Sequence, residues 1–79
     1  MIETNQNFTQ AQVFADELQK LRVDVTAADR DIAMQELEIF SKSTISNYLN
    51  GIVRDNDTAA SLIAIFKRLI AERNKVLAA

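Results

Sequence analysis

Residues 41–51 read Ser-Lys-Ser-Thr-Ile-Ser-Asn-Tyr-Leu-Asn-Gly. If this segment is helical, one side of the helix is apolar at Ile45, Tyr48 and Leu49. The opposite side carries short polar groups and one cation, namely Lys42, Ser43, Ser46, Asn47 and Asn50. Gly51 then ends the helix, because glycine adopts the left-handed backbone conformation without steric cost. The pattern predicts a short helix over 41–50 that packs by one side only.

The polar side of this helix has an unusual composition. Solvated helices generally expose Glu, Lys and Arg, whereas short hydroxyl and amide groups can approach a groove wall and bond to base edges or phosphates. No acidic residue occurs from Ile39 to Arg54, and the two charged residues there, Lys42 and Arg54, are cations. A helix N-terminus adds backbone N–H groups and a partial positive charge that favour a phosphate. The local chemistry favours contact with DNA.

Segment 41–51 resembles the recognition helix of the lambda-repressor-like (Cro-type) helix-turn-helix family. Its Ser-x-x-Thr-Ile-Ser core is also similar to the LacI-type motif, and Asn50-Gly51 is similar to the pair that closes this helix in many Cro-type repressors. The resemblance covers the motif well and the rest of the chain loosely, through helix number and length. It implies that helix 41–50 enters the major groove of double-stranded DNA while the preceding helix braces it across the backbone.

The resemblance also implies a role for each polar residue. Four side chains would face bases, namely Lys42, Ser43, Ser46 and Asn47. Three others would contact phosphates, namely Ser41, Asn50 and Arg54. Ile45 and Tyr48 match the buried positions that pack against the bracing helix. The chain departs from the family between Ala33 and Ser41, where it lacks the family's glycine and is one or two residues longer, so we expect a remodelled turn.

Composition predicts an all-α fold for the whole chain. The 79 residues include no proline and one glycine, and they are rich in good helix formers. There is no cysteine and no histidine, which excludes disulfides and the common zinc sites, so stability must come from helix packing. We expect one domain over 1–79, a compact four- or five-helix bundle that contains a helix-turn-helix.

Capping patterns place the first two helices. Two capping boxes pair Thr9 with Gln12 and Thr26 with Asp29. They predict a first helix over 9–22 and a bracing helix over 26–38. The first helix has one apolar face, formed by Ala11, Phe14, Ala15, Leu18 and Leu21. In the bracing helix, the residues expected to face inward are Ala28, Ile32 and Leu37.

The last predicted helix spans 57–78, with Asp57 as its N-cap. Its core residues are Leu62, Ile65, Phe66, Leu69 and Ile70. Val76 and Leu77 follow further on, so we hypothesise that 71–79 contributes to a symmetric homodimer. Such a dimer would place two recognition helices on half-sites about 34 Å apart. In the alternative, this end packs back on the first helix or frays.

Other function classes are disfavoured. A net charge of −2 argues against a non-specific nucleic-acid packager. Without His, Cys or a Gly-rich phosphate loop, and with carboxylates on helices expected to be exposed, we predict no enzyme, cofactor, metal or small-molecule substrate. The acidic run in 26–38 lacks the spacing of a calcium loop. Neither a secretory signal nor an apolar span is present, so we expect a cytoplasmic protein without membrane contact.

The sequence therefore predicts a DNA-binding transcription regulator that reads the major groove with helix 41–50. The alternative is a helical protein–protein interaction module, such as an adaptor or an antitoxin-like partner, that does not bind DNA. It would use the acidic helix 26–38 or the C-terminal helix. Replacing Ser46 and Asn47 with Glu separates the two hypotheses, because only DNA binding should be lost.

Overall fold

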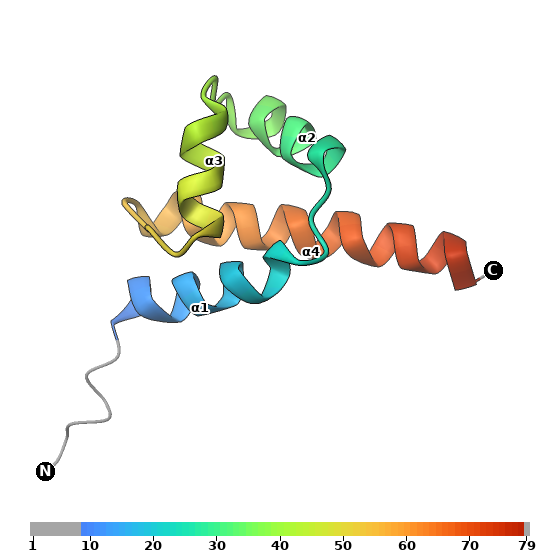
Figure 1. Cartoon of the computed structure of the whole chain (residues 1–79), viewed down its shortest axis with the longest axis horizontal. Helices are drawn as coiled ribbons and strands as arrows, with labels where there is room; N and C mark the ends of the chain where they lie inside the picture. The colour runs from blue at the N-terminus through green and yellow to red at the C-terminus, as the bar shows by residue number, and fades with distance from the viewer. Residues whose placement is uncertain (1–8, 79) are drawn as a thin grey trace, which may run out of the picture.

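The computed structural model describes residues 9–78, and side chains up to residue 75. The described residues form four α-helices and no strand (Figure 1). Their bounds are α1 Gln10–Arg22, α2 Ala27–Leu37, α3 Lys42–Leu49 and α4 Asn56–Ala78. The prediction of an all-helical chain is confirmed over these residues, and each helix lies within one residue of its expected bounds.

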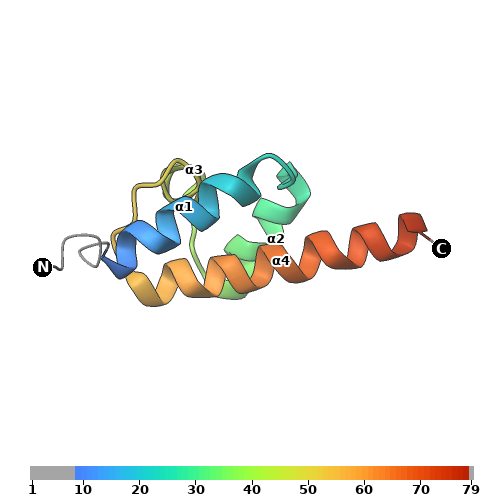
Figure 2. The same ribbon diagram turned by 90° about the horizontal axis from the view of Figure 1, so that it is seen from below.

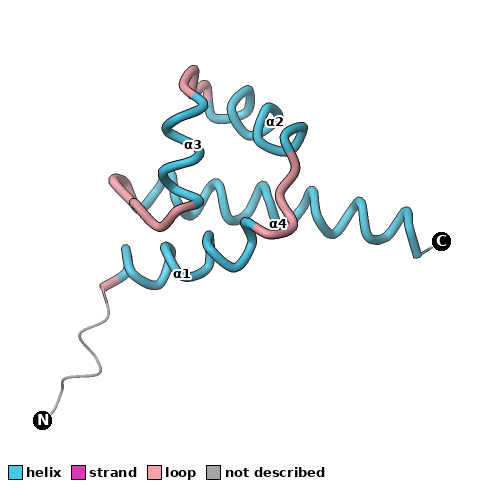
Figure 3. Tube along the Cα trace, viewed as in Figure 1, coloured by secondary structure: helices cyan, strands magenta, loops and turns pink. Residues whose placement is uncertain are grey.

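The helices pack in two pairs. α1 and α4 lie side by side and run in the same direction (Figures 1 and 2). α3 runs across this pair and packs on α1, whereas α2 packs on α4 and also contacts α3. The connections, pink in Figure 3, are residues 23–26, 38–41 and 50–55. This arrangement places α2 and α3 together on one side of the α1–α4 pair.

The hydrophobic core lies where the four helices meet. Its largest fully buried side chains are Leu18, Ile45, Leu49, Leu62 and Phe66. Burial of each such side chain contributes about 1.5–3 kcal/mol to folding. Tyr48 is also buried, so the prediction that α3 packs through Ile45, Tyr48 and Leu49 is confirmed. The core therefore fixes which side of α3 remains available.

The predicted inward face of α2 is wrong for two of its three residues. Ala28 is exposed and Ile32 is 36% exposed, whereas Leu37 is partly buried and packs against the core. The buried residues are instead Asp29 and Ala33. Apolar residues are distributed around most of α2, so periodicity does not select a face. The burial of Asp29 determines the face, because this carboxylate is paired with Arg73 of α4 at 2.8 Å.

Both predicted capping boxes are present. The Thr9 hydroxyl accepts from the Gln12 amide at 3.1 Å, and the Thr26 hydroxyl accepts from the Asp29 amide at 3.1 Å. In each box the side chain three residues on accepts from the backbone N–H of the threonine. These reciprocal bonds satisfy donors at helix N-termini that would otherwise lack partners.

The predicted cap of α4 is wrong. The helix begins at Asn56, and the capping residue is Asp55 rather than Asp57. Asp55 Oδ2 accepts from the Thr58 amide at 2.9 Å and from the Thr58 hydroxyl at 2.6 Å. The hydrogen bond from the Thr58 hydroxyl lowers the pKa of Asp55 most, and the bond from the Thr58 amide lowers it further, so this pKa lies below its ordinary value. Asp55 and Asp57 both lie just before the apolar part of α4. Only Asp55 stands three residues before Thr58, whose amide and hydroxyl both donate to its carboxylate.

The C-terminal part of α4 extends beyond the other three helices (Figures 1 and 2). The side chains of Val76 and Leu77, on which the homodimer hypothesis depends, lie outside the described residues. Among the described helices, none combines the length and the apolar character needed to cross a membrane.

Candidate nucleic-acid interface

The C-terminal end of α3 is fixed by a contact with α1. Gly51 has φ +92°, which confirms the predicted left-handed residue. Gln19 Nε2 donates to the Asn50 carbonyl at 2.9 Å and occupies the space beside this glycine. A Cβ at Gly51 would meet the end of the exposed Gln19 side chain, which could move aside at the loss of this hydrogen bond. The left-handed backbone conformation is therefore the reason that the position favours glycine.

The connection between α2 and α3 contains a left-handed residue that is not glycine. Glu38 adopts the left-handed conformation with φ +55° and ψ +41°. The Glu38 amide donates to the Gln35 carbonyl and the Ile39 amide donates to the Met34 carbonyl, at 3.3 and 2.9 Å. This is the Schellman pattern that satisfies the last carbonyls of a helix. The left-handed position is therefore occupied by a glutamate, although glycine would adopt it at lower cost.

The exposed side of α3 is a polar stripe. Ser43, Asn47 and Asn50 follow each other at spacings of four and three residues, so they share one helix face. Ser43 and Asn50 are exposed and Asn47 is half-buried. Ser41 is at the N-cap position and is exposed, but its side chain makes no capping hydrogen bond. The hydroxyl of Ser41 is therefore not committed to its own helix.

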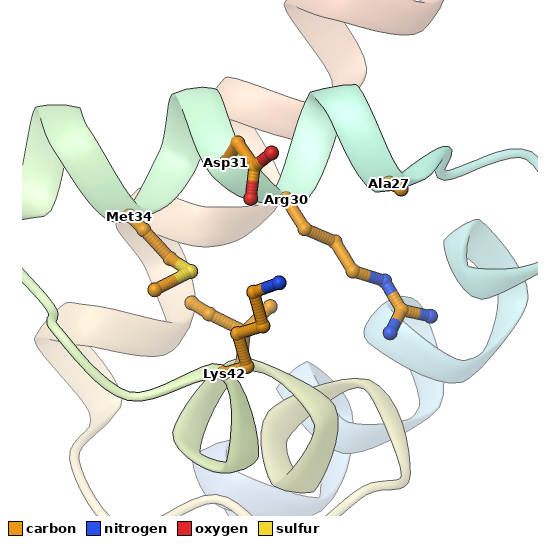
Figure 4. Close-up of a pocket in the computed structure, with 6 residues that line it drawn as sticks. Ala27, Arg30, Asp31, Met34 and Lys42 are labelled. Atoms are coloured by element: carbon orange, nitrogen blue, oxygen red, sulfur yellow. The ribbon is translucent and has the colours of Figure 1, made fainter.

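Arg30 of α2 lies beside α3 and is a further candidate site residue, which we did not predict from the sequence. Arg30 Nη1 donates to Ser46 Oγ at 3.5 Å. Arg30 and Lys42 extend from α2 and α3 into the space between these helices, and Asp31 lies on the same side (Figure 4). The hollow has a volume of about 150 Å³ and is lined by Ala27, Arg30, Asp31, Met34, Lys42 and Ile45.

The register of α2 explains why Arg30 was missed. With Ala28 and Ile32 facing inward, Arg30 would lie away from α3. Because Asp29 and Ala33 are buried instead, Arg30 reaches the neighbourhood of Lys42. Arg30 could be identified only once Asp29 was known to be buried. The spacing of apolar residues in the sequence does not show this burial.

The other side of α3 carries a second hollow, of about 180 Å³. Its lining residues are Thr44, Asn47, Tyr48, Ile52 and Arg54. Tyr48 is buried, and its hydroxyl accepts from the Asp55 amide at 3.1 Å. This bond fixes the connection 50–55 against α3, so the exposed Arg54 stands beside Asn47.

The seven predicted site residues thus fall into four adjacent groups. Ser41 is at the N-cap of α3, and Lys42 and Ser46 face α2. Ser43, Asn47 and Asn50 form the polar stripe, and Arg54 stands beyond its end. Arg30, Lys42 and Arg54 supply three cations along this surface, and Asp31 is the carboxylate lining the hollow between α2 and α3. Such a surface can donate and accept hydrogen bonds, with a modest excess of positive charge. Within residues 9–78, no cluster of carboxylates suited to a metal ion occurs.

Comparison with known proteins found no matching family model, no matching curated protein and no matching solved structure.

Proposed function

We propose that this chain is a sequence-specific DNA-binding transcription regulator in which α2 and α3 act as a helix-turn-helix. The single observation that carries the proposal is the two-sided character of α3. Ile45, Tyr48 and Leu49 are buried, while Ser43, Asn47 and Asn50 form a stripe of short polar groups. A helix of this kind can enter the major groove, where hydroxyl and amide groups can hydrogen-bond to base edges.

Specificity would come from the stripe and affinity from the cations. Asn is suited to adenine, because its amide can both accept from N6 and donate to N7. Arg30 and Arg54 lie on either side of the stripe and would contact phosphates. We propose the same role for Lys42, for which the resemblance implied a base contact, because it lies on the side of α3 that faces α2 and not in the stripe. Three phosphate contacts predict a slope of about 3 in a plot of log affinity against log salt, since each contributes about 0.9.

Regulation would follow from occupancy of an operator-like site, without chemistry or a cofactor. A homodimer through the protruding end of α4 would give two such helices in a symmetric arrangement. Sedimentation equilibrium tests this part separately. A monomer at high concentration would contradict the dimer and leave single-site binding intact.

The test of DNA binding uses duplexes selected from a random library by the 79-residue chain. We expect Ser43→Glu with Asn47→Glu to abolish binding, because two carboxylates would face the DNA. The matched control is Ala60→Glu with Ala64→Glu, which adds the same two negative charges at exposed positions of α4. Fluorescence anisotropy at low salt measures affinity, and circular dichroism verifies folding. Equal affinity of the double variant and the control would refute the proposal.

Arg30 gives a second, independent readout. We expect Arg30→Ala to weaken binding to all duplexes alike and to lower the salt slope by about 1. Asn47→Ala should instead relax the base preference at one position of the site. An unchanged salt slope in Arg30→Ala would remove this residue from the interface.

A further inference from the structure

Phe40 is the most exposed large apolar side chain among the described residues. It is 91% exposed and lies in the connection 38–41, at the C-terminal end of α2. A Phe side chain has roughly 150–250 Å² to bury, and here most of it faces solvent. It borders a hollow of about 240 Å³ whose lining residues are Asp31, Met34, Gln35, Ile39 and Phe40. The fold itself gains little from an aromatic ring at this position.

Two exposed carboxylates lie beside the apolar side chains of this hollow. Asp31 lines it directly, and Glu38 lies two residues before Phe40 in the same connection. Glu36, on the last turn of α2, pairs with Arg68 of α4, so its charge is balanced. The surface therefore combines an apolar centre with a border that carries negative charge at Asp31 and Glu38.

The charge of this border argues for one class of occupant. Asp31 and Glu38 would repel DNA phosphates here, because Arg30 and Lys42, which offset Asp31 in the neighbouring hollow, do not line this one. This surface is therefore less suited to DNA than the polar stripe of α3. A second copy meeting it symmetrically would place these carboxylates against their own equivalents, which is also unfavourable. A partner with apolar residues flanked by cations would satisfy both features of the surface.

We propose that Met34, Ile39 and Phe40 form a docking surface for an amphipathic helix of another protein, with Lys or Arg beside its apolar face. Helices of this kind bind through apolar side chains spaced three or four residues apart. Phe40 would be the principal contact, since aromatic residues dominate the energetics of interfaces. Asp31 and Glu38 would pair with the cations of the partner and orient it.

This surface adjoins the candidate DNA interface, because Asp31 and Met34 line both this hollow and the hollow beside Lys42. Ile39 and Phe40 line only the docking surface, and none of its residues belongs to the polar stripe of α3. The proposal therefore depends on Phe40 and not on DNA binding by α3.

The test uses two synthetic amphipathic helical peptides with leucines at the same positions. One carries lysines on its polar face and the other carries glutamates. Each is titrated into the isotope-labelled 79-residue chain, and amide NMR shifts and calorimetric affinity are recorded. We expect the lysine peptide to shift the amides of 34–40 and to bind at least tenfold more tightly than the glutamate peptide.

Matched variants assign the effect to Phe40. Phe40→Ser should weaken the lysine peptide at least tenfold, whereas Val23→Ser, at a side chain that is 84% exposed on another part of the surface, should change affinity less than twofold. Asp31→Lys with Glu38→Lys should reverse the preference between the two peptides. Thermal unfolding confirms that each variant is folded.

Several outcomes would overturn the proposal. These are equal binding of the two peptides, equal weakening by the two serine variants, or shifts spread over the whole chain. Failure of the lysine peptide to bind would also overturn it. Shifts at 39–40 on dilution of the free protein would identify a second copy as the occupant, and shifts there with duplex DNA would identify DNA.

Discussion

The two ends of α2 differ in the kind of side chain that is buried or exposed. At the N-terminal end, Asp29 is a charged residue that is only 5% exposed. Its carboxylate accepts from the Thr26 amide at 3.0 Å and from Arg73 at 2.8 Å. At the C-terminal end, Phe40 is an apolar residue that is 91% exposed. A single short helix thus has a buried charge near one end and an exposed aromatic ring beyond the other.

The difference separates structural residues from candidate binding residues. A buried carboxylate is tolerated only when it is paired and hydrogen-bonded, and Asp29 meets both conditions. Arg73 also donates to the Asp24 carbonyl, so one side chain of α4 ties down α2 and the connection before it. An exposed aromatic ring has no comparable role in folding. Together with Met34 and Ile39 it forms the surface for which we propose a partner.

Between the two ends of α2, the larger expected effect on stability is at the buried pair. Arg73→Ala leaves the Asp29 carboxylate buried without its partner, and we expect the free energy of unfolding to fall by about 2–3 kcal/mol. The control is Arg68→Ala, which removes the exposed pair with Glu36 and should cost about 0–1 kcal/mol. Urea denaturation measures both. Equal losses would mean that burial does not distinguish the two pairs.

The pH dependence of the free energy of unfolding also tests the contribution of the buried Asp29 carboxylate. Burial acts to raise the pKa of Asp29, but the Thr26 amide and Arg73 together outweigh it, so its pKa lies below the ordinary value. A carboxyl with a lowered folded-state pKa stabilises the fold above its unfolded-state pKa, and this stability is lost as pH falls through the folded-state value. We expect Asp29→Asn to cost about 1–2 kcal/mol at pH 7. The difference from the unchanged chain should shrink below about pH 4.

Urea denaturation at a series of pH values measures this difference. A difference that stays constant down to pH 2.5 would show that the charge of Asp29 does not contribute. The control is Asp16→Asn on the exposed surface of α1, which should show little difference at any pH.

Caps and strongly amphipathic segments could be predicted from the sequence. The two capping boxes, the helix bounds and the buried side of α3 needed only local spacing, because each depends on residues three or four apart. The glycine after α3 was also predictable, since few other residues adopt its backbone conformation. All of these features are local in the chain.

Features that depend on distant residues could not be predicted. Asp29 is buried because Arg73, 44 residues later, pairs with it, and no local pattern shows this. That burial rotates α2 and brings Arg30 to the candidate interface. The capping of α4 by Asp55 depended on a choice between two nearby aspartates. The exposure of Phe40 depends on the conformation of the connection 38–41. From the sequence we expected only that this turn would differ from the one typical of the family.

A smaller effect is expected at Glu38, between the two ends of the comparison. Its left-handed backbone costs a non-glycine residue about 1–2 kcal/mol. Glycine avoids this cost, but its greater conformational entropy in the unfolded state offsets part of the gain. We expect Glu38→Gly to stabilise the chain by about 1 kcal/mol. The control Gln35→Gly, inside α2, should destabilise it by about 1 kcal/mol. Thermal denaturation measures both, and destabilisation by Glu38→Gly would contradict the left-handed assignment.

The smallest expected effect is at Phe40. Because the ring is almost fully exposed, Phe40→Ser should change the free energy of unfolding by less than about 0.5 kcal/mol. Phe66→Ala, at a fully buried phenylalanine, should instead cost about 3–5 kcal/mol. Urea denaturation compares the two directly. A loss above 1 kcal/mol in Phe40→Ser would mean that the ring packs against the protein in solution, and then it would not be available to a partner. A negligible loss would leave intermolecular contact as the role that accounts for an aromatic residue at this position.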